Sequence, residues 1–164
     1  MQPDIVSMGK GLGNGYPVSA IAMSPEIIDR LKALSFRYFQ SHQNDPLGCS
    51  IAREVIRLIQ EEGLIERSKR IGTLFKNELK QLAKRHAIIK EVRGRGLMMA
   101  LEFFDGQENM QGESIFEELL RRRIIITSRR GLNILRIDPP LITKEDDIYY
   151  FLDNLNQILL FYRF

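Results

Sequence analysis

The sequence contains few of the residues from which disulfide bonds and metal sites are built. Among its 164 residues there are one cysteine, two histidines and no tryptophan. Cys49 has no second thiol to pair with, and together with His42 and His86 it is too sparse a set for a structural zinc site. We therefore predict no metal centre, and the low cysteine content favours a reducing, cytoplasmic setting.

Long apolar runs and an excess of one charge are also missing. No apolar stretch approaches the ~20 residues that a membrane span needs, and residues 1–8 lack the features of a secretion signal. The 24 basic and 21 acidic residues are mixed along the sequence and give a formal net charge of +3. We expect no membrane and no nucleic-acid partner, although the run Arg121–Arg123 leaves a weakly basic nucleic-acid binder open as an alternative.

The composition that remains is typical of one or two small globular domains, with 44% hydrophobic and 27% charged residues. Apolar residues recur with helical spacing at about 25–34, 49–59, 71–82, 115–120 and 148–159. Apolar runs typical of strands lie at 4–8, 20–23, 92–104, 124–126 and 132–137. Residues 124–126 and 132–137 are expected to pair as antiparallel strands across Ser128–Gly131. The first half is thus predicted to be α/β and the second half α+β, with a small sheet covered by helices.

The beginning of the sequence resembles the interior of a longer protein. The strand predicted at residues 4–8 runs directly into a glycine cluster, and no earlier element is there to pair with it. We expect the chain to be the C-terminal portion of a larger fold.

Lys10 is the most informative residue, because it follows an apolar strand and lies in a loop, residues 9–19, that holds four of the twelve glycines. A lysine that forms an imine needs room beside it for a flat aldehyde ring, and small neighbours provide that room. From composition alone, the alternative is that Lys10 is an ordinary solvated lysine of a loop, with no part in chemistry. Nucleotide-binding loops do not fit, since Gly11 stands where a phosphate loop needs Ser or Thr, and Tyr16 where the dinucleotide motif needs its third glycine.

Four segments, in order, resemble the class III aminotransferase family, whose members depend on pyridoxal phosphate (PLP). Residues 3–17, PDIVSMGKGLGNGYP, resemble the segment of the active-site lysine. Residues 38–47, YFQSHQNDPL, are similar to the loop that crosses a dimer interface to the cofactor phosphate, in the form found in the dialkylglycine decarboxylase branch. Residues 93–97, RGRGL, and 135–142, LRIDPPLI, are the third and fourth matches.

The resemblance implies a role for one residue in each of three of these segments. Lys10 would be the Schiff-base and proton-transfer residue, Ser41 a phosphate ligand contributed to the neighbouring subunit, and Arg136 the clamp on the substrate α-carboxylate. Ser41 stands where the family more often has threonine, and either hydroxyl can donate to a phosphate oxygen. Arg93 and Arg95 could bind an anion or brace the turn into the strand, and bracing is the favoured interpretation.

The implied fold is the C-terminal part of a PLP-dependent transferase. Residues 1–46 would be the remnant of the PLP-binding large domain, 47–86 the connecting and small-domain helices, and 87–164 a small α+β domain. In the family, the aspartate at the pyridine nitrogen, the stacking aromatic residue and the glycine-rich phosphate helix all precede the lysine. The isolated chain is therefore expected to be inactive, and to need a homodimer or a missing N-terminal half.

The implied reaction moves an amino group between an amino acid or amine and a 2-oxo acid. Simple transamination and transfer coupled to decarboxylation both stay open at this point. The alternative from a different class is a non-catalytic remnant that keeps the small-domain fold and acts in oligomerisation or binding.

Overall fold

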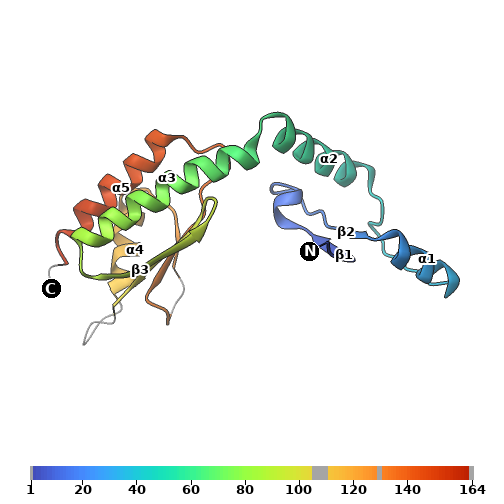
Figure 1. Ribbon diagram of the computed structural model, residues 1–164, viewed down its shortest axis with the longest axis horizontal. Coiled ribbons are helices and arrows are strands. Elements are labelled where there is room, and N and C mark those ends of the chain that lie inside the picture. The colour runs from blue at the N-terminus through green and yellow to red at the C-terminus, as the bar shows by residue number, and fades with distance from the viewer. Residues whose placement is uncertain (1, 105–110, 129–130, 163–164) are drawn as a thin grey trace. The chain divides into compact units, whose positions relative to one another are not determined.

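The chain divides into two compact units, Met1–Gly63 and Leu64–Phe164. In the computed structural model shown in Figure 1, the structure describes residues 2–104, 111–128 and 131–162. No helix in these ranges is both long enough and apolar enough to cross a lipid bilayer.

The first unit is built around a two-stranded antiparallel ribbon. Strands β1 (Ile5–Met8) and β2 (Ala20–Met23) are joined by the glycine-rich loop, which contains the short 3-10 helix η1 (Lys10–Leu12). Helices α1 (Pro25–Ala33) and α2 (Pro46–Glu61) follow. Ser24 caps α1 by accepting the Ile27 N–H at 3.4 Å, and Pro25 occupies the first position of the helix. The two strands and both helices are confirmed.

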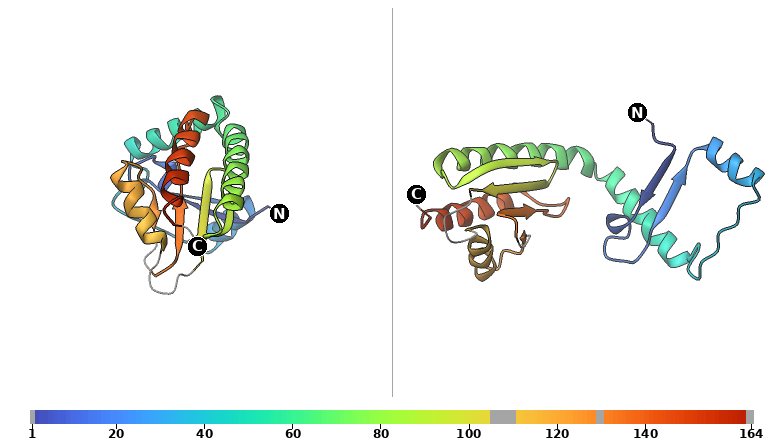
Figure 2. Two further views of the ribbon diagram at one scale, coloured as in Figure 1. Left: turned by 90° about the vertical axis from the view of Figure 1, so that its left-hand side faces the viewer. Right: turned by 90° about the horizontal axis from the view of Figure 1, so that it is seen from below.

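The second unit is a four-stranded antiparallel sheet with three helices. In chain order its elements are α3 (Leu64–Arg85), β3 (Ile89–Arg95), β4 (Met98–Phe103), α4 (Gln111–Arg121), β5 (Thr127–Ser128), β6 (Ile134–Ile137) and α5 (Glu145–Leu159). The strand order is β3-β4-β6-β5, which places β4 and β6 in the centre. Figure 2 shows the strands and the helices of this unit from two further directions.

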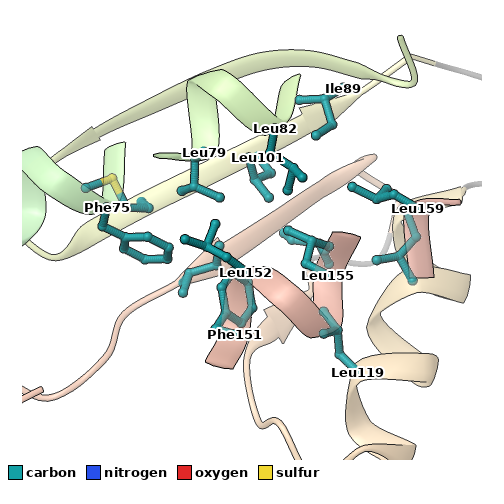
Figure 3. Close-up of a cluster of buried hydrophobic side chains, with 14 of the residues drawn as sticks. Phe75, Leu79, Leu82, Ile89, Leu101, Leu119, Phe151, Leu152, Leu155 and Leu159 are labelled. Atoms are coloured by element: carbon teal, nitrogen blue, oxygen red, sulfur yellow. The ribbon is translucent and has the colours of Figure 1, made fainter. Parts of the chain in front are cut away.

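One face of this sheet is apolar and is covered by all three helices. Burial alternates along β4 and β6, so that Leu101 and Leu135 point into the core while their neighbours in the strands point away. Figure 3 shows α3, α5, α4 and the strands contributing to a single cluster. Phe75 of α3 meets Phe151 of α5 edge to face, with ring centroids 5.7 Å apart. The predicted small sheet covered by helices is confirmed.

Two strand predictions were wrong in detail. The single strand predicted at 92–104 is a hairpin, because Gly96 adopts a φ of +57° and turns the chain between β3 and β4. Ile124–Ile126 is not a strand, since the Ile124 N–H still bonds to the Leu119 carbonyl at the end of α4, at 2.9 Å. The pairing strand is β5, just after it, and Arg129 and Arg130 of the predicted turn lie outside the described residues.

The loop between α1 and α2 is irregular, and most of its residues are exposed. Phe36 and Tyr38 are each 60% exposed and Phe39 is 80% exposed.

Asn133 joins three elements of the second unit, and its replacement by alanine should be costly. The side chain is 7% exposed; it accepts the Gly112 N–H at 2.7 Å and donates to the Phe104 carbonyl at 2.7 Å. Asn133→Ala leaves these buried groups unpaired, so we expect the free energy of unfolding to fall by about 2–4 kcal/mol. Urea denaturation, monitored by circular dichroism, measures this change in the free energy of unfolding. Asn77→Ala, on the exposed face of α3, is the control, with an expected change within about 0.5 kcal/mol; equal losses would contradict the prediction.

Candidate functional site

Lys10 lies where β1 ends and the chain turns. Its backbone has a φ of +49°, an uncommon value for a residue other than glycine. The turn is held by the Leu12 N–H bonding to the Gly9 carbonyl and the Gly13 N–H bonding to the Lys10 carbonyl, both at 3.1 Å. The side chain is exposed, and within the described ranges no ion pair or hydrogen bond engages its amine. The loop therefore fixes the backbone of Lys10 and leaves its amine available.

The glycines around Lys10 have two different functions. A Cβ atom at Gly11 would meet nothing within 4 Å, and one at Gly9 would find only Ser19 Cβ, at 3.8 Å. A Cβ atom at Gly13 would lie 2.0 Å from the Tyr16 carbonyl oxygen, so the loop can close only with glycine there. The two glycines beside Lys10 carry no side chain that would crowd a ring-bearing aldehyde at its amine, so these residues fit PLP chemistry.

Ser41 lies in an exposed turn that ends at the start of α2. Asp45 caps that helix by accepting the Gly48 N–H at 2.8 Å, and Asn44 before it has a φ of +59°. Gly48 is buried; a Cβ atom there would be 3.5 Å from both Tyr16 and Val18 of the lysine loop. The start of α2 thus anchors both the Lys10 loop and the Ser41 turn within the first unit.

Arg136 lies in the second unit, on central strand β6. It pairs with Ala100 of β4 and Thr127 of β5 and points away from the helix-covered core. The side chain is 43% exposed; its Nε forms an ion pair with Asp138 Oδ2 at 2.6 Å, and its Nη2 contacts Met98 Sδ at 3.6 Å. The outer edge of the guanidinium retains donors for a carboxylate.

Asp138 was missed by the sequence reasoning. It lies two residues after Arg136, and residues i and i+2 of an extended strand point to the same face. This spacing in the segment LRIDPPLI was a usable signal.

Other candidates from the sequence have structural partners. Arg93 pairs with Glu91 and Glu102, each at 2.5 Å, and its hydrogen bonds to Glu102 and Glu91 raise its pKa. Hydrogen bonds from Lys90 and Arg93 in turn lower the pKa of Glu102. Arg93 thus braces the hairpin, whereas Arg95, for which bracing was also the favoured interpretation, forms no ion pair or side-chain hydrogen bond within the described ranges.

The arginine run and the histidine on the α3 side are also engaged within the second unit. Arg121 and Arg122 both pair with Glu118 of α4, at 3.0 and 3.8 Å. His86 Nε2 lies 2.8 Å from Asn156 Oδ1. Within the part of the chain that the structure describes, no three His, Cys, Asp or Glu side chains gather as a metal site would require.

The comparisons with known proteins agree on a single family. The family described as aminotransferase class-III matches residues 1–159. The chain is 34% identical to ethanolamine-phosphate phospho-lyase homolog 1 of Caenorhabditis elegans over 96% of its length, and 32% identical to alanine–glyoxylate aminotransferase 2 homolog 2, mitochondrial, of Arabidopsis thaliana over 94%. It spans 35% and 33% of these two relatives.

Solved structures confirm the fold. A transaminase from the marine bacterium Virgibacillus superimposes with a TM-score of 0.90 at 27% identity, over 98% of this chain and 39% of the transaminase. The resemblance identified in the sequence is therefore confirmed over nearly the whole chain. This chain belongs to the class III aminotransferases, a family whose cofactor is PLP.

Proposed function

We propose that this chain is the C-terminal part of a PLP-dependent aminotransferase that moves an amino group between an amino acid or amine and a 2-oxo acid. The observation that carries the proposal is the amine of Lys10, exposed and without a partner in the described ranges, between two glycines that add no side chain beside it. PLP, when bound, supplies an aldehyde that condenses with primary amines and a conjugated ring that withdraws electrons from the substrate.

Lys10 would have two tasks in this reaction. Its Nζ would hold the cofactor aldehyde between turnovers, and once displaced by substrate the same amine would take and return the proton at the substrate α-carbon. Both tasks need a neutral amine within reach of the carbon, on a backbone that stays fixed. The hydrogen-bonded turn from Gly9 to Gly13 provides that fixed backbone.

Ser41 would donate its hydroxyl proton to the cofactor phosphate of a neighbouring subunit, which makes a homodimer part of the proposal. Its exposure and its anchored position before α2 support this role. We also propose the family's division of the chain at residues 46 and 86, and a cytoplasmic location. The pyridine-nitrogen partner and the phosphate helix are assigned to protein outside this chain.

Arg136 would grip the α-carboxylate with two parallel hydrogen bonds, while Asp138 holds its Nε. Lysine cannot reproduce this planar fork, so in the assembled enzyme Arg136→Lys should raise KM for a 2-oxo acid by about 10–100-fold. The rate with an amine that has no carboxylate should change little. Arg121→Lys, at an exposed ion pair, is the control. An equal loss with both substrates would show that Arg136 acts on folding rather than on the carboxylate.

Simple transamination and decarboxylation differ in which bond of the substrate α-carbon is broken. The 38–47 segment resembles the dialkylglycine decarboxylase branch. Coupling to decarboxylation is therefore the second candidate reaction. Analysis of the products for CO2 and keto acid separates it from simple transamination.

The function is tested by borohydride reduction of the chain, assembled with the rest of its cofactor site and PLP. Reduction traps an imine as a stable amine, and peptide mass spectrometry locates it. An adduct on Lys10 supports the enzyme. No adduct on Lys10 in an assembly that binds PLP would instead support the non-catalytic remnant.

A further inference from the structure

A cleft of about 590 Å³ is lined by residues of the first half of α3 and of the turn of the β3–β4 hairpin. It belongs wholly to the second unit, and neither Lys10, Ser41 nor Arg136 lines it. Its lining from α3 comes at positions 65, 68, 69, 72, 73 and 76, a spacing that places all six residues on one face of the helix. The cleft is therefore a feature separate from the proposed catalytic residues.

The walls of the cleft are held together by backbone contact. A Cβ atom at Gly72 would lie 2.0 Å from the Gly96 carbonyl oxygen, so the hairpin turn lies directly against the helix. Gly96 itself has a φ of +57°, as the first central residue of a two-residue turn requires. The side chains on either side of this contact are thereby held at fixed positions relative to one another.

Three cations and no carboxylate line the cleft. Lys76 Nζ donates to the Gly94 carbonyl at 2.9 Å, which holds the ammonium group at the cleft. Lys69 and Arg95 are exposed, and within the described ranges neither forms an ion pair or a side-chain hydrogen bond. Arg93, two residues before Arg95, is by contrast neutralised by two glutamates. The positive charge of the cleft is therefore uncompensated by the described residues.

We propose that this cleft binds a phosphate group. A guanidinium matches two phosphate oxygens with parallel hydrogen bonds, and the two lysines add compact charges from α3. The Ser68 hydroxyl can donate to a further oxygen. Ile65 and Met99 give the cleft apolar walls as well, so the phosphate can be carried by a small organic ester or be free. This proposal makes no use of Lys10 or of PLP.

The test is a titration of the 15N-labelled 164-residue chain with inorganic phosphate and, separately, with phenyl phosphate. We expect amide shifts concentrated at Gly72, Arg95 and Gly96. Lys69→Gln combined with Arg95→Gln should weaken binding by about tenfold or more, because two charged donors are lost. Arg95→Lys keeps the positive charge but loses the planar guanidinium, so we expect an intermediate loss of phosphate affinity. Tighter binding of phenyl phosphate identifies an ester as the ligand, and equal affinity identifies free phosphate.

The matched control is Lys80→Gln combined with Lys84→Gln, which also removes two positive charges, both from α3 and outside the cleft. If both double variants weakened phosphate binding equally, the binding would be a diffuse attraction to positive charge, and the proposed site would be overturned. So would the absence of shifts at the cleft with both ligands. Because the titration contains no PLP, either result leaves the proposed transaminase function unaffected.

Discussion

Lys10→Ala is expected to abolish the borohydride-trapped adduct and to lower kcat of the assembled enzyme by at least about 10²–10⁴-fold, the usual contribution of a general acid–base group. In the proposed reaction one amine would serve both tasks, so the loss of imine formation would add to the loss of proton transfer. Nothing in the described ranges pairs with this amine, so its removal should leave the fold unchanged. Absorbance near ~420 nm with added PLP follows the imine.

Two variants separate chemistry from charge in this experiment. Lys10→Arg keeps a cation on the same backbone but cannot condense with an aldehyde, because the guanidinium stays protonated. It should be as inactive as the alanine variant. Lys32→Ala removes an exposed lysine of α1 that pairs with Asp29, and the adduct should persist. An adduct in Lys10→Ala equal to that of the unmodified chain would refute the assignment of Lys10.

Gly72→Ala should be among the most destabilising single changes in the second unit. The new Cβ atom would lie 2.0 Å from the Gly96 carbonyl oxygen and 2.4 Å from its carbon, both of them backbone atoms that cannot rotate away. Such overpacking costs about 1–3 kcal/mol or more, against about 1 kcal/mol gained by replacing glycine within a helix. We expect the free energy of unfolding to fall by about 2 kcal/mol. A urea titration measures this fall as a lower midpoint of unfolding.

The comparison for Gly72 is Lys80→Ala, which places alanine on the exposed side of the same helix. Lysine and alanine have similar helix propensities. The free energy of unfolding of Lys80→Ala should therefore stay within about 0.5 kcal/mol of that of the unmodified chain. If Gly72→Ala were as stable as this control, the hairpin turn would have to lie further from α3 than the structure places it.

Long amphipathic helices were the part of the fold that the sequence predicted best. The apolar positions of α3 and α5 recur with helical spacing because each helix buries one stripe in the core. The hairpin was missed because the buried Leu97, inside its turn, begins the apolar run of β4, so the turn was assigned to the strand. β5 was misplaced because Ile124–Ile126 have the residues of a strand but the hydrogen bonding of a helix end.

The candidate site was predictable only in part. The family resemblance and its glycine neighbours singled out Lys10. Which glycines leave space and which allow a close contact depends on the Tyr16 carbonyl, whose position only the folded loop determines. In the same way, the uncompensated charge of Lys69 and Arg95 depends on a hairpin that the sequence reading had merged into one strand.

The two units differ in how much of their stability comes from within the chain. Every buried large apolar side chain in the described residues belongs to the second unit, while in residues 2–63 the buried residues are Gly13 and Gly48. The unit that carries Lys10 thus has no buried apolar core of its own among the described residues. Such a design would make the chemistry of Lys10 conditional on assembly, so that an unassembled chain in the cell would not act on free aldehydes as an enzyme does.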